Sequence, residues 1–177
     1  MLFQRIENDN DYGPRTVQSY LGGEKIHYCK GILQKQFGLF SRFVEETLII
    51  TNIAIYNFIK GLNKTSEYKT SYLKRRIKIE DIYGITYSSG SNEFIIHLNK
   101  NDYDCLFKSD NRDEIIILLL KQYEKIKHHD ILFTVKSDKE LSKYIVTQKE
   151  RRKNPYLFKL DKNDLYSIRE FFHLEEE

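Results

Sequence analysis

A chain of 177 residues, 40% of them hydrophobic and 14% aromatic, can form one domain with extensions at its ends. Its formal net charge of +3 excludes a polycation that binds nucleic acid by charge alone. Two cysteines, Cys29 and Cys105, are too few for a disulfide framework. No apolar run follows Met1, and the longest apolar stretch, 115–120, is too short to cross a bilayer. We therefore expect a cytoplasmic chain without a signal peptide or a transmembrane segment.

The first predicted element is an extended arm over residues 1–24, which is polar and is interrupted by Gly13-Pro14 and Gly22-Gly23. Alternation of apolar and polar residues then predicts antiparallel strands separated by short turns. Seven strands are expected, at 26–36, 43–51, 53–59, 73–79, 85–88, 93–98 and 103–107.

The strand at 73–79 has the clearest pattern of the seven. It places isoleucine on one face and basic residues on the other, as in a half-exposed antiparallel strand. The basic residues on that outer face are Lys74, Arg76 and Lys78. Gly84, a few residues later, is expected where the backbone turns sharply or closely approaches a neighbour.

An amphipathic helix is predicted after the strands. Ser109 and Asp110 provide its cap, and apolar residues recur at helical spacing as far as Ile126. Three further elements are expected beyond it: a strand at 131–136, a short helix from a capping box at 137–140 to Tyr144, and an amphipathic helix at 161–172.

Together these elements predict a mostly β, α+β fold. The order of seven strands and one helix is that of a seven-stranded antiparallel pleckstrin-homology-like barrel capped by a C-terminal helix, with a helical C-terminal extension. The expected subdivision is an arm at 1–24, the barrel and its helix at 25–128, an extension at 129–153 and a helical arm at 154–177.

Several short motifs in the middle of the chain occur in a characteristic order. They are Lys74-Arg75-Arg76-Ile77, Asp81-Ile82, Gly84-Ile85, Ser88, Phe94-Ile95-Ile96-His97-Leu98, Leu106-Phe107-Lys108-Ser109 and Gln122-Tyr123. This series resembles the tail-homology domain of class I myosins, itself a pleckstrin-homology-like fold, over roughly residues 25–150. The resemblance is to the tail alone, so we expect no motor function from this chain.

The resemblance implies binding of acidic phospholipids by basic residues on the first two strands and the loop between them. The matching residues in this chain are Lys35 and Arg42. Glu45 and Glu46 follow closely, and two carboxylates beside a phosphate site would oppose binding by like-charge repulsion.

Two basic clusters are further candidates for contact with phosphates or with an acidic protein surface. The first comprises Lys74, Arg75, Arg76 and Lys78, and the alternative is a solvated strand face. The second cluster comprises Lys149, Arg151, Arg152 and Lys153, and the alternative for it is a charged linker before Asn154-Pro155. Because aromatic residues do not interleave with either cluster, we expect no nucleic-acid partner.

The titratable residues do not form a recognisable catalytic pattern. His128-His129-Asp130 lacks distant partners at metal-ligand spacing and is expected to be a polar turn. His97 is expected to be structural and Asp81 to cap a turn. No nucleophile, base and orienting group can be assembled, so we predict no enzyme activity, no cofactor and no metal.

The first functional hypothesis is a non-catalytic adaptor that docks onto a cytoskeletal or ciliary (axonemal) assembly, with actin and microtubules left open. The alternative is a peripheral membrane module that binds acidic phosphoinositides through Lys35, Arg42 and 74–76, and an enzyme is the least favoured reading. The expected location is accordingly the cytoskeleton or cilium, or else the membrane periphery. The last helix presents an apolar stripe for docking to a partner or for packing on its own domain: Leu165, Ile168, Phe171 and Phe172.

Overall fold

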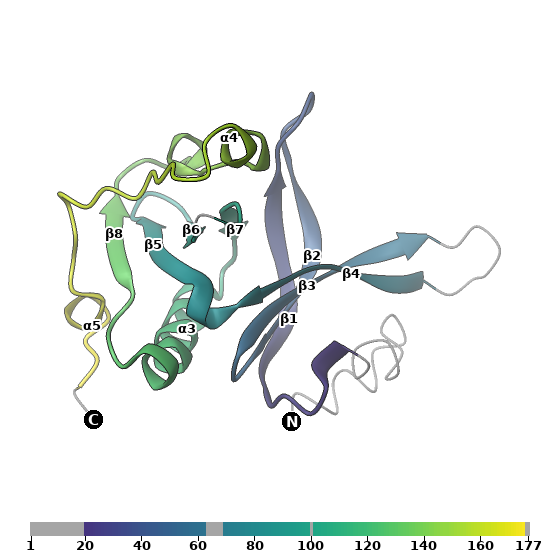
Figure 1. Ribbon diagram of the computed structural model, residues 1–177, viewed down its shortest axis with the longest axis horizontal. Coiled ribbons are helices and arrows are strands. Elements are labelled where there is room, and N and C mark those ends of the chain that lie inside the picture. The colour runs from purple at the N-terminus through teal and green to yellow at the C-terminus, as the bar shows by residue number, and fades with distance from the viewer. Residues whose placement is uncertain (1–19, 63–68, 100, 176–177) are drawn as a thin grey trace. The chain divides into compact units, whose positions relative to one another are not determined.

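The computed structural model describes residues 20–62, 69–99 and 101–175 (Figure 1). The regular structure of these residues is mostly β, and the strands form one sheet with the order β4-β3-β2-β1-β7-β6-β5-β8. The strands are β1 (Ile26–Gln36), β2 (Arg42–Thr51), β3 (Ala54–Leu62), β4 (Lys69–Lys78), β5 (Ile82–Ser88), β6 (Glu93–Leu98), β7 (Cys105–Lys108) and β8 (Leu132–Lys136).

The sheet is open, so the prediction of a closed seven-stranded barrel is wrong. All seven predicted strands are present, but β8 is an eighth member of the sheet and pairs parallel to β5, with Gly84 opposite Leu132. The two outermost strands, β4 and β8, end the sheet instead of pairing with each other. The strand predicted at 131–136 is confirmed, and the sheet does not close.

Among the helical elements of the described residues, one is long and the others have six residues or fewer. The predicted amphipathic helix is confirmed as α3 (Arg112–Lys127), which buries Ile116, Leu119 and Tyr123. The other helical elements are η1 (Ile79–Asp81), η2 (Ser142–Tyr144), α4 (Gln148–Lys153) and α5 (Ile168–Phe171).

The chain divides into two compact units. Unit 1 contains the described residues of Met1–Ile32 and Glu45–Ile79, and unit 2 contains those of Leu33–Val44 and Glu80–Glu177. Strands β1 and β2 contribute to both units. Most of the predicted arm at 1–24 lies outside the described residues, and the other predicted domain limits remain predictions.

The core of unit 1 forms on one face of the β2–β3–β4 strands. Ile49 of β2 pairs with Tyr56 of β3, and both are buried together with Phe58, Ala54 and Leu21. Burial of aromatic and branched side chains across neighbouring strands stabilises such a sheet.

Unit 2 is built from β5–β8, α3 and the segments that follow β8. In one of its clusters, Ile95 and Leu106 from neighbouring strands pack against Leu141 and Ile145, and Phe43 from the start of β2 joins them. The sequence-predicted role of Gly84 is also resolved here, because a side-chain carbon at this position would lie 2.9 Å from the backbone oxygen of Leu132. Close approach of a neighbour, and not a turn, therefore requires glycine inside β5.

The C-terminal segment departs from its predicted form. The helix expected at 161–172 is reduced to the four residues of α5. Lys136 of β8 forms ion pairs with Asp161 and Asp164, at 3.1 and 3.2 Å, and Leu165 forms a bridge to Thr134. These contacts hold the chain along β8 in a non-helical course.

The predicted capping box at 137–140 is also wrong. The capping box of this region lies ten residues later, where Thr147 and Glu150 open α4. The segment before it contains only the single turn of η2.

Candidate functional site

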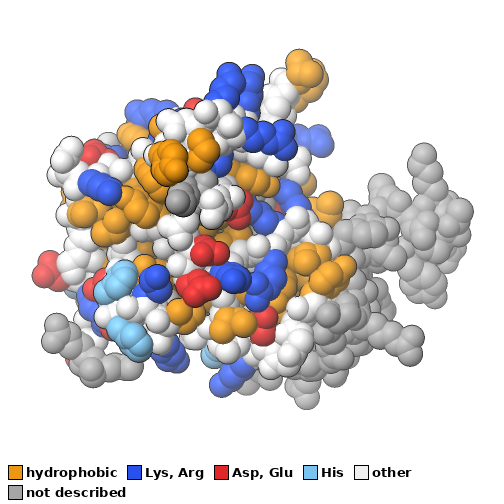
Figure 2. All heavy atoms as spheres, in the orientation of Figure 1, with side chains coloured by type: hydrophobic (Ala, Val, Ile, Leu, Met, Phe, Trp, Pro, Cys, Tyr) orange, Lys and Arg blue, Asp and Glu red, His pale blue; other side chains and the backbone are white. Residues whose placement is uncertain are grey.

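The end of the β1–β2 hairpin exposes two large apolar side chains. Leu39 is 98% exposed and Phe40 is 87% exposed in the loop 37–41 that joins the two strands. Figure 2 shows hydrophobic side chains at the tip of this hairpin. Exposed apolar residues at a loop tip are unfavourable in water unless they contact another molecule or a membrane. We call Leu39 and Phe40 the apolar tip.

Two cationic side chains lie near Phe43, at the start of β2. The β1–β7 register pairs Leu33 with Lys108, which places Lys35 and Lys108 on the same face of the sheet. The Lys35 Nζ lies 4.9 Å from the centre of the Phe43 ring, and the Lys108 Nζ lies 5.7 Å from the same centre. The face of the ring attracts both ammonium groups.

Arg42 is the third cation at this end of the hairpin. It is the first residue of β2, is exposed, and lies two positions after Phe40. The site therefore combines the apolar tip with three cations, Lys35, Arg42 and Lys108. Sequence reasoning identified Lys35 and Arg42, but it missed the apolar tip and Lys108.

The two glutamates expected to oppose this site behave differently. The Glu46 side chain is fully buried in unit 1, where it accepts a hydrogen bond from Asn57 Nδ2 at 2.8 Å and forms an ion pair with Lys74. Its charge is thus compensated inside the fold, while Glu45 is exposed. The expected repulsion is reduced to that of a single carboxylate.

The ion pair with Glu46 depends on a β-bulge. The β3–β4 register passes from Asn57 opposite Arg75 to Phe58 opposite Leu73, so Lys74 has no opposite residue. A bulge of this kind re-aims the side chain of the extra residue. The prediction that Lys74 shares the solvent face of Arg76 is therefore wrong.

Arg76 is also engaged inside unit 1. Its Nε donates a hydrogen bond to Tyr56 Oη at 2.9 Å, and its Nη2 donates one to Glu24 Oε1 at 3.1 Å. Burial raises the pKa of Tyr56, so its hydroxyl stays protonated at neutral pH and donates to Glu24 at 2.8 Å. Two of the four cations of this cluster thus bind carboxylates of unit 1. The other two are the half-buried Arg75 and the exposed Lys78.

The second predicted basic cluster lies on α4, and its members also differ in burial. Arg151 is only 6% exposed, and its guanidinium group donates hydrogen bonds to backbone carbonyl oxygens at 2.6–3.3 Å. The acceptors are those of Asp102, Pro155, Leu157 and Leu98. The prediction of a surface contact is wrong for Arg151, because it secures the backbone of unit 2. The exposed members of the cluster are Lys149, Arg152 and Lys153.

The predicted apolar docking stripe packs largely on its own unit. Ile168 is 1% exposed, and the rings of Phe171 and Phe172 lie 5.2 and 5.8 Å from the ring of Phe133. The docking prediction is therefore wrong for the buried Ile168, whereas Phe171 and Phe172 pack on Phe133 but are only half-buried, so their docking role stays a prediction. Leu165, which is 45% exposed, is the member of the stripe that remains at the surface.

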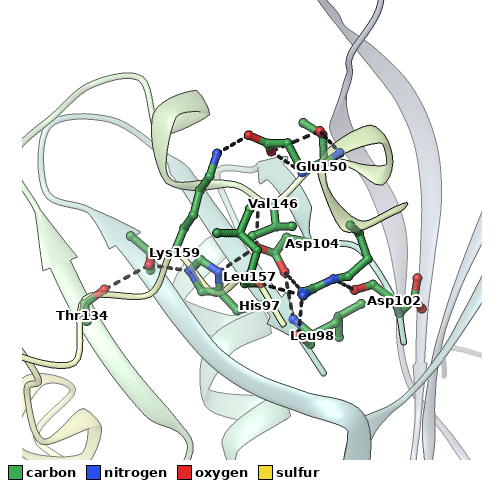
Figure 3. A network of polar contacts seen from close by, with 12 residues as sticks. His97, Leu98, Asp102, Asp104, Thr134, Val146, Glu150, Leu157 and Lys159 are labelled. Atoms are coloured by element: carbon green, nitrogen blue, oxygen red, sulfur yellow. Dashed lines mark hydrogen bonds and ion pairs between the residues drawn. The ribbon is translucent and has the colours of Figure 1, made fainter. Parts of the chain in front are cut away.

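His97 lies in a buried polar network of unit 2 (Figure 3). Its Nδ1 lies 2.9 Å from Asp104 Oδ2, and its Nε2 lies 2.6 Å from Thr86 Oγ1. The Thr86 hydroxyl in turn lies 3.0 Å from Thr134 Oγ1. This order of hydroxyl, imidazole and carboxylate is that of a hydrolase triad, but His97 is 1% exposed and Asp104 is 3% exposed. A site sealed from solvent cannot admit a substrate, so the network is structural.

Apart from the hairpin, the described residues offer little that resembles a binding site. Within residues 20–62, 69–99 and 101–175, no group of three or more His, Cys, Asp or Glu side chains is placed to hold a metal ion. None of the helices in the described part of the chain has the length and apolar content needed to span a bilayer. A hollow of about 330 Å³ is lined by the rings of Tyr83 and Phe158 together with Asp81, Asn99, Asn101 and Asp102.

The sequence matches a family model over most of its length and a curated relative over about half. The family model described as "Unconventional myosin tail, actin- and lipid-binding" matches residues 5–165. Myosin heavy chain IB of Acanthamoeba castellanii is 30% identical over 84 residues, which is 48% of this chain. The chain spans only 7% of the length of that relative.

Solved structures of similar shape share little sequence with the chain. The hSac2 domain from human phosphoinositide phosphatase Sac2 has a TM-score of 0.47 and 17% identity, with 69% of this chain and 86% of that chain covered. The N-terminal PH domain of human ARAP2 has a TM-score of 0.45 and 14% identity, with 59% and 84% covered. The predicted resemblance to a myosin tail is confirmed by the family model, which matches most of the sequence. The chain therefore belongs to the unconventional myosin tail family, a family of actin- and lipid-binding domains.

Proposed function

We propose that this chain is a non-catalytic module that attaches to membranes containing acidic phospholipids, with the end of the β1–β2 hairpin as its contact. The observation that carries this proposal is the near-complete exposure of Leu39 and Phe40 beside three cations. Apolar side chains enter the hydrocarbon boundary of a bilayer, and Lys and Arg remain at the level of the phosphates.

The expected energies fit reversible binding. Complete burial of a Leu or Phe side chain contributes about 1.5–3 kcal/mol, so the apolar tip offers about 3–6 kcal/mol. Each Lys or Arg close to an anionic surface adds about 1 kcal/mol, and three are present at Lys35, Arg42 and Lys108. These sums are typical of a peripheral protein that needs both signals, since neither the apolar nor the cationic part alone gives stable attachment.

A second candidate function is docking onto an acidic cytoskeletal assembly, with actin as the partner. Support comes from the family description, which names actin, and from exposed cations on α4. The comparisons give no support to a cilium, an axoneme or a microtubule, so we retain only the actin-based form of this hypothesis.

Co-sedimentation with vesicles tests the first proposal. We expect the whole chain to bind vesicles of phosphatidylcholine and phosphatidylserine, to ignore phosphatidylcholine alone, and to bind more weakly as salt rises. The double change Lys35→Glu and Arg42→Glu should reduce binding by about 10-fold or more, because it replaces attraction with repulsion.

The matched control reverses two exposed lysines of α3, with Lys121→Glu and Lys125→Glu, and has the same change in net charge. If both variants lose binding equally, general charge and not the hairpin governs attachment. Binding to actin filaments with no binding to any acidic vesicle would overturn the membrane proposal in favour of the adaptor.

A further inference from the structure

A second cationic surface lies at the same end of unit 2 as the hairpin. Phe43, next to Arg42, packs with Leu141 and Ile145 in one cluster, and Ile145 precedes α4 by three residues. The chain that leads into α4 is therefore fixed against the base of the hairpin. Figure 1 shows α4 and the hairpin end at one end of unit 2, and α3 lies toward the other.

The position of α4 is fixed by polar contacts on its inner side. The capping box of Thr147 and Glu150 closes its first turn. Arg151 anchors the helix through its hydrogen bonds to four backbone carbonyl groups of unit 2. A helix held in this way presents its remaining side chains in a defined direction.

The outer side of α4 is cationic. Lys149, Arg152 and Lys153 are exposed on it. The only acidic residue in the α4 sequence is Glu150, which accepts a hydrogen bond from Lys159 Nζ at 2.8 Å. Its charge is thus compensated within unit 2, and Figure 2 shows Lys and Arg side chains gathered over this end of the molecule.

We infer that α4 is a second membrane contact, in which Lys149, Arg152 and Lys153 lie on acidic phospholipid headgroups while the apolar tip enters the bilayer. This inference rests on the proposed function, because it assigns a second contact to the same membrane. Binding at two places would fix the orientation of unit 2 on the bilayer, which a single hairpin tip cannot do.

A bilayer fits this surface better than a protein partner does. Stable protein interfaces depend on buried aromatic or apolar anchors surrounded by a polar rim. The exposed side chains of α4 are Gln148, Lys149, Arg152 and Lys153, and the ring of Tyr156, three residues beyond the helix, is 71% exposed. Lys, Arg and Tyr together are the residues that reside at the headgroup level of a membrane.

The test compares two triple variants that remove the same charge. One changes Lys149, Arg152 and Lys153 to Gln, and the other changes Lys121, Lys125 and Lys127 on α3 to Gln. All six side chains are exposed, so both variants should fold, and urea unfolding checks this. We expect the α4 variant to bind phosphatidylcholine–phosphatidylserine vesicles roughly 10-fold to 100-fold more weakly, and the α3 variant to change far less.

Equal binding by the two variants would overturn the inference. So would an α4 variant that keeps full vesicle binding and loses actin co-sedimentation, since α4 would then be a protein contact. Either result leaves the hairpin proposal standing if the Lys35→Glu and Arg42→Glu variant binds about 10-fold or more weakly than the wild type, as expected above. A wild-type chain that binds no acidic vesicle would instead overturn the proposed function itself.

Discussion

Replacing Leu39 and Phe40 together by serine is expected to lower binding to acidic vesicles by about 100-fold or more. The change removes about 3–6 kcal/mol of apolar transfer energy, and each 1.4 kcal/mol corresponds to a factor of ten. The stability of the fold should not decrease, because these side chains are 98% and 87% exposed and contribute little to the core. Vesicle co-sedimentation and urea unfolding measure the two effects separately.

A matched control replaces an exposed apolar residue elsewhere. Ile53, in the turn between β2 and β3, is 42% exposed, and Ile53→Ser should leave vesicle binding unchanged. Retention of full binding by the hairpin variant would contradict the role assigned to the apolar tip. The cations alone would then have to account for attachment.

Asp104→Ala is expected to destabilise unit 2 by about 3 kcal/mol or more, since each buried donor that loses its acceptor costs about 1–3 kcal/mol. The Asp104 carboxylate accepts hydrogen bonds from the backbone N–H groups of Leu98 and Val146, at 3.0 and 2.9 Å, and from the His97 ring at 2.9 Å. These donors belong to β6 and to the segment before α4, so the loss also loosens the connection between them. Urea unfolding with a probe in unit 2 measures the change.

The control for this prediction removes an exposed carboxylate. Asp110 accepts one hydrogen bond from Asn92 Nδ2 at 2.8 Å at the surface, and Asp110→Ala should change stability by about 0.5–1.5 kcal/mol at most. If Asp104→Ala were no more destabilising than Asp110→Ala, the buried network would not be a structural element of unit 2.

The strands were predictable because their signal is local. Alternation of apolar and polar residues identified β1 with its observed limits, Ile26–Gln36, and the helical spacing identified α3. Closure of the sheet could not be predicted, because it depends on which distant strands pair. The parallel pairing of β8 with β5 has no signature within either strand.

The candidate site was only partly predictable, for the same reason. Lys35 and Arg42 follow from the resemblance, but Lys108 joins them through the β1–β7 register, which brings distant segments together. The apolar tip did have a local signal, since Phe-Gly-Leu-Phe is an unusual sequence for a hairpin loop.

Two basic residues were misassigned because their partners are distant or are backbone groups. Lys74 is re-aimed by a β-bulge toward the buried Glu46 of another strand. Arg151 binds carbonyl oxygens, which every residue carries and which no sequence pattern reveals. A run of basic residues therefore did not distinguish a surface cation from one that holds the fold together.

The apolar tip is best tested with a single fluorescent residue placed in it. The chain contains no Trp, so Phe40→Trp introduces one emitter at the end of the hairpin. On phosphatidylcholine–phosphatidylserine vesicles, its emission should move to shorter wavelength and be quenched by lipids brominated on their acyl chains. Unchanged emission from a chain that still co-sediments with these vesicles would contradict insertion of the hairpin.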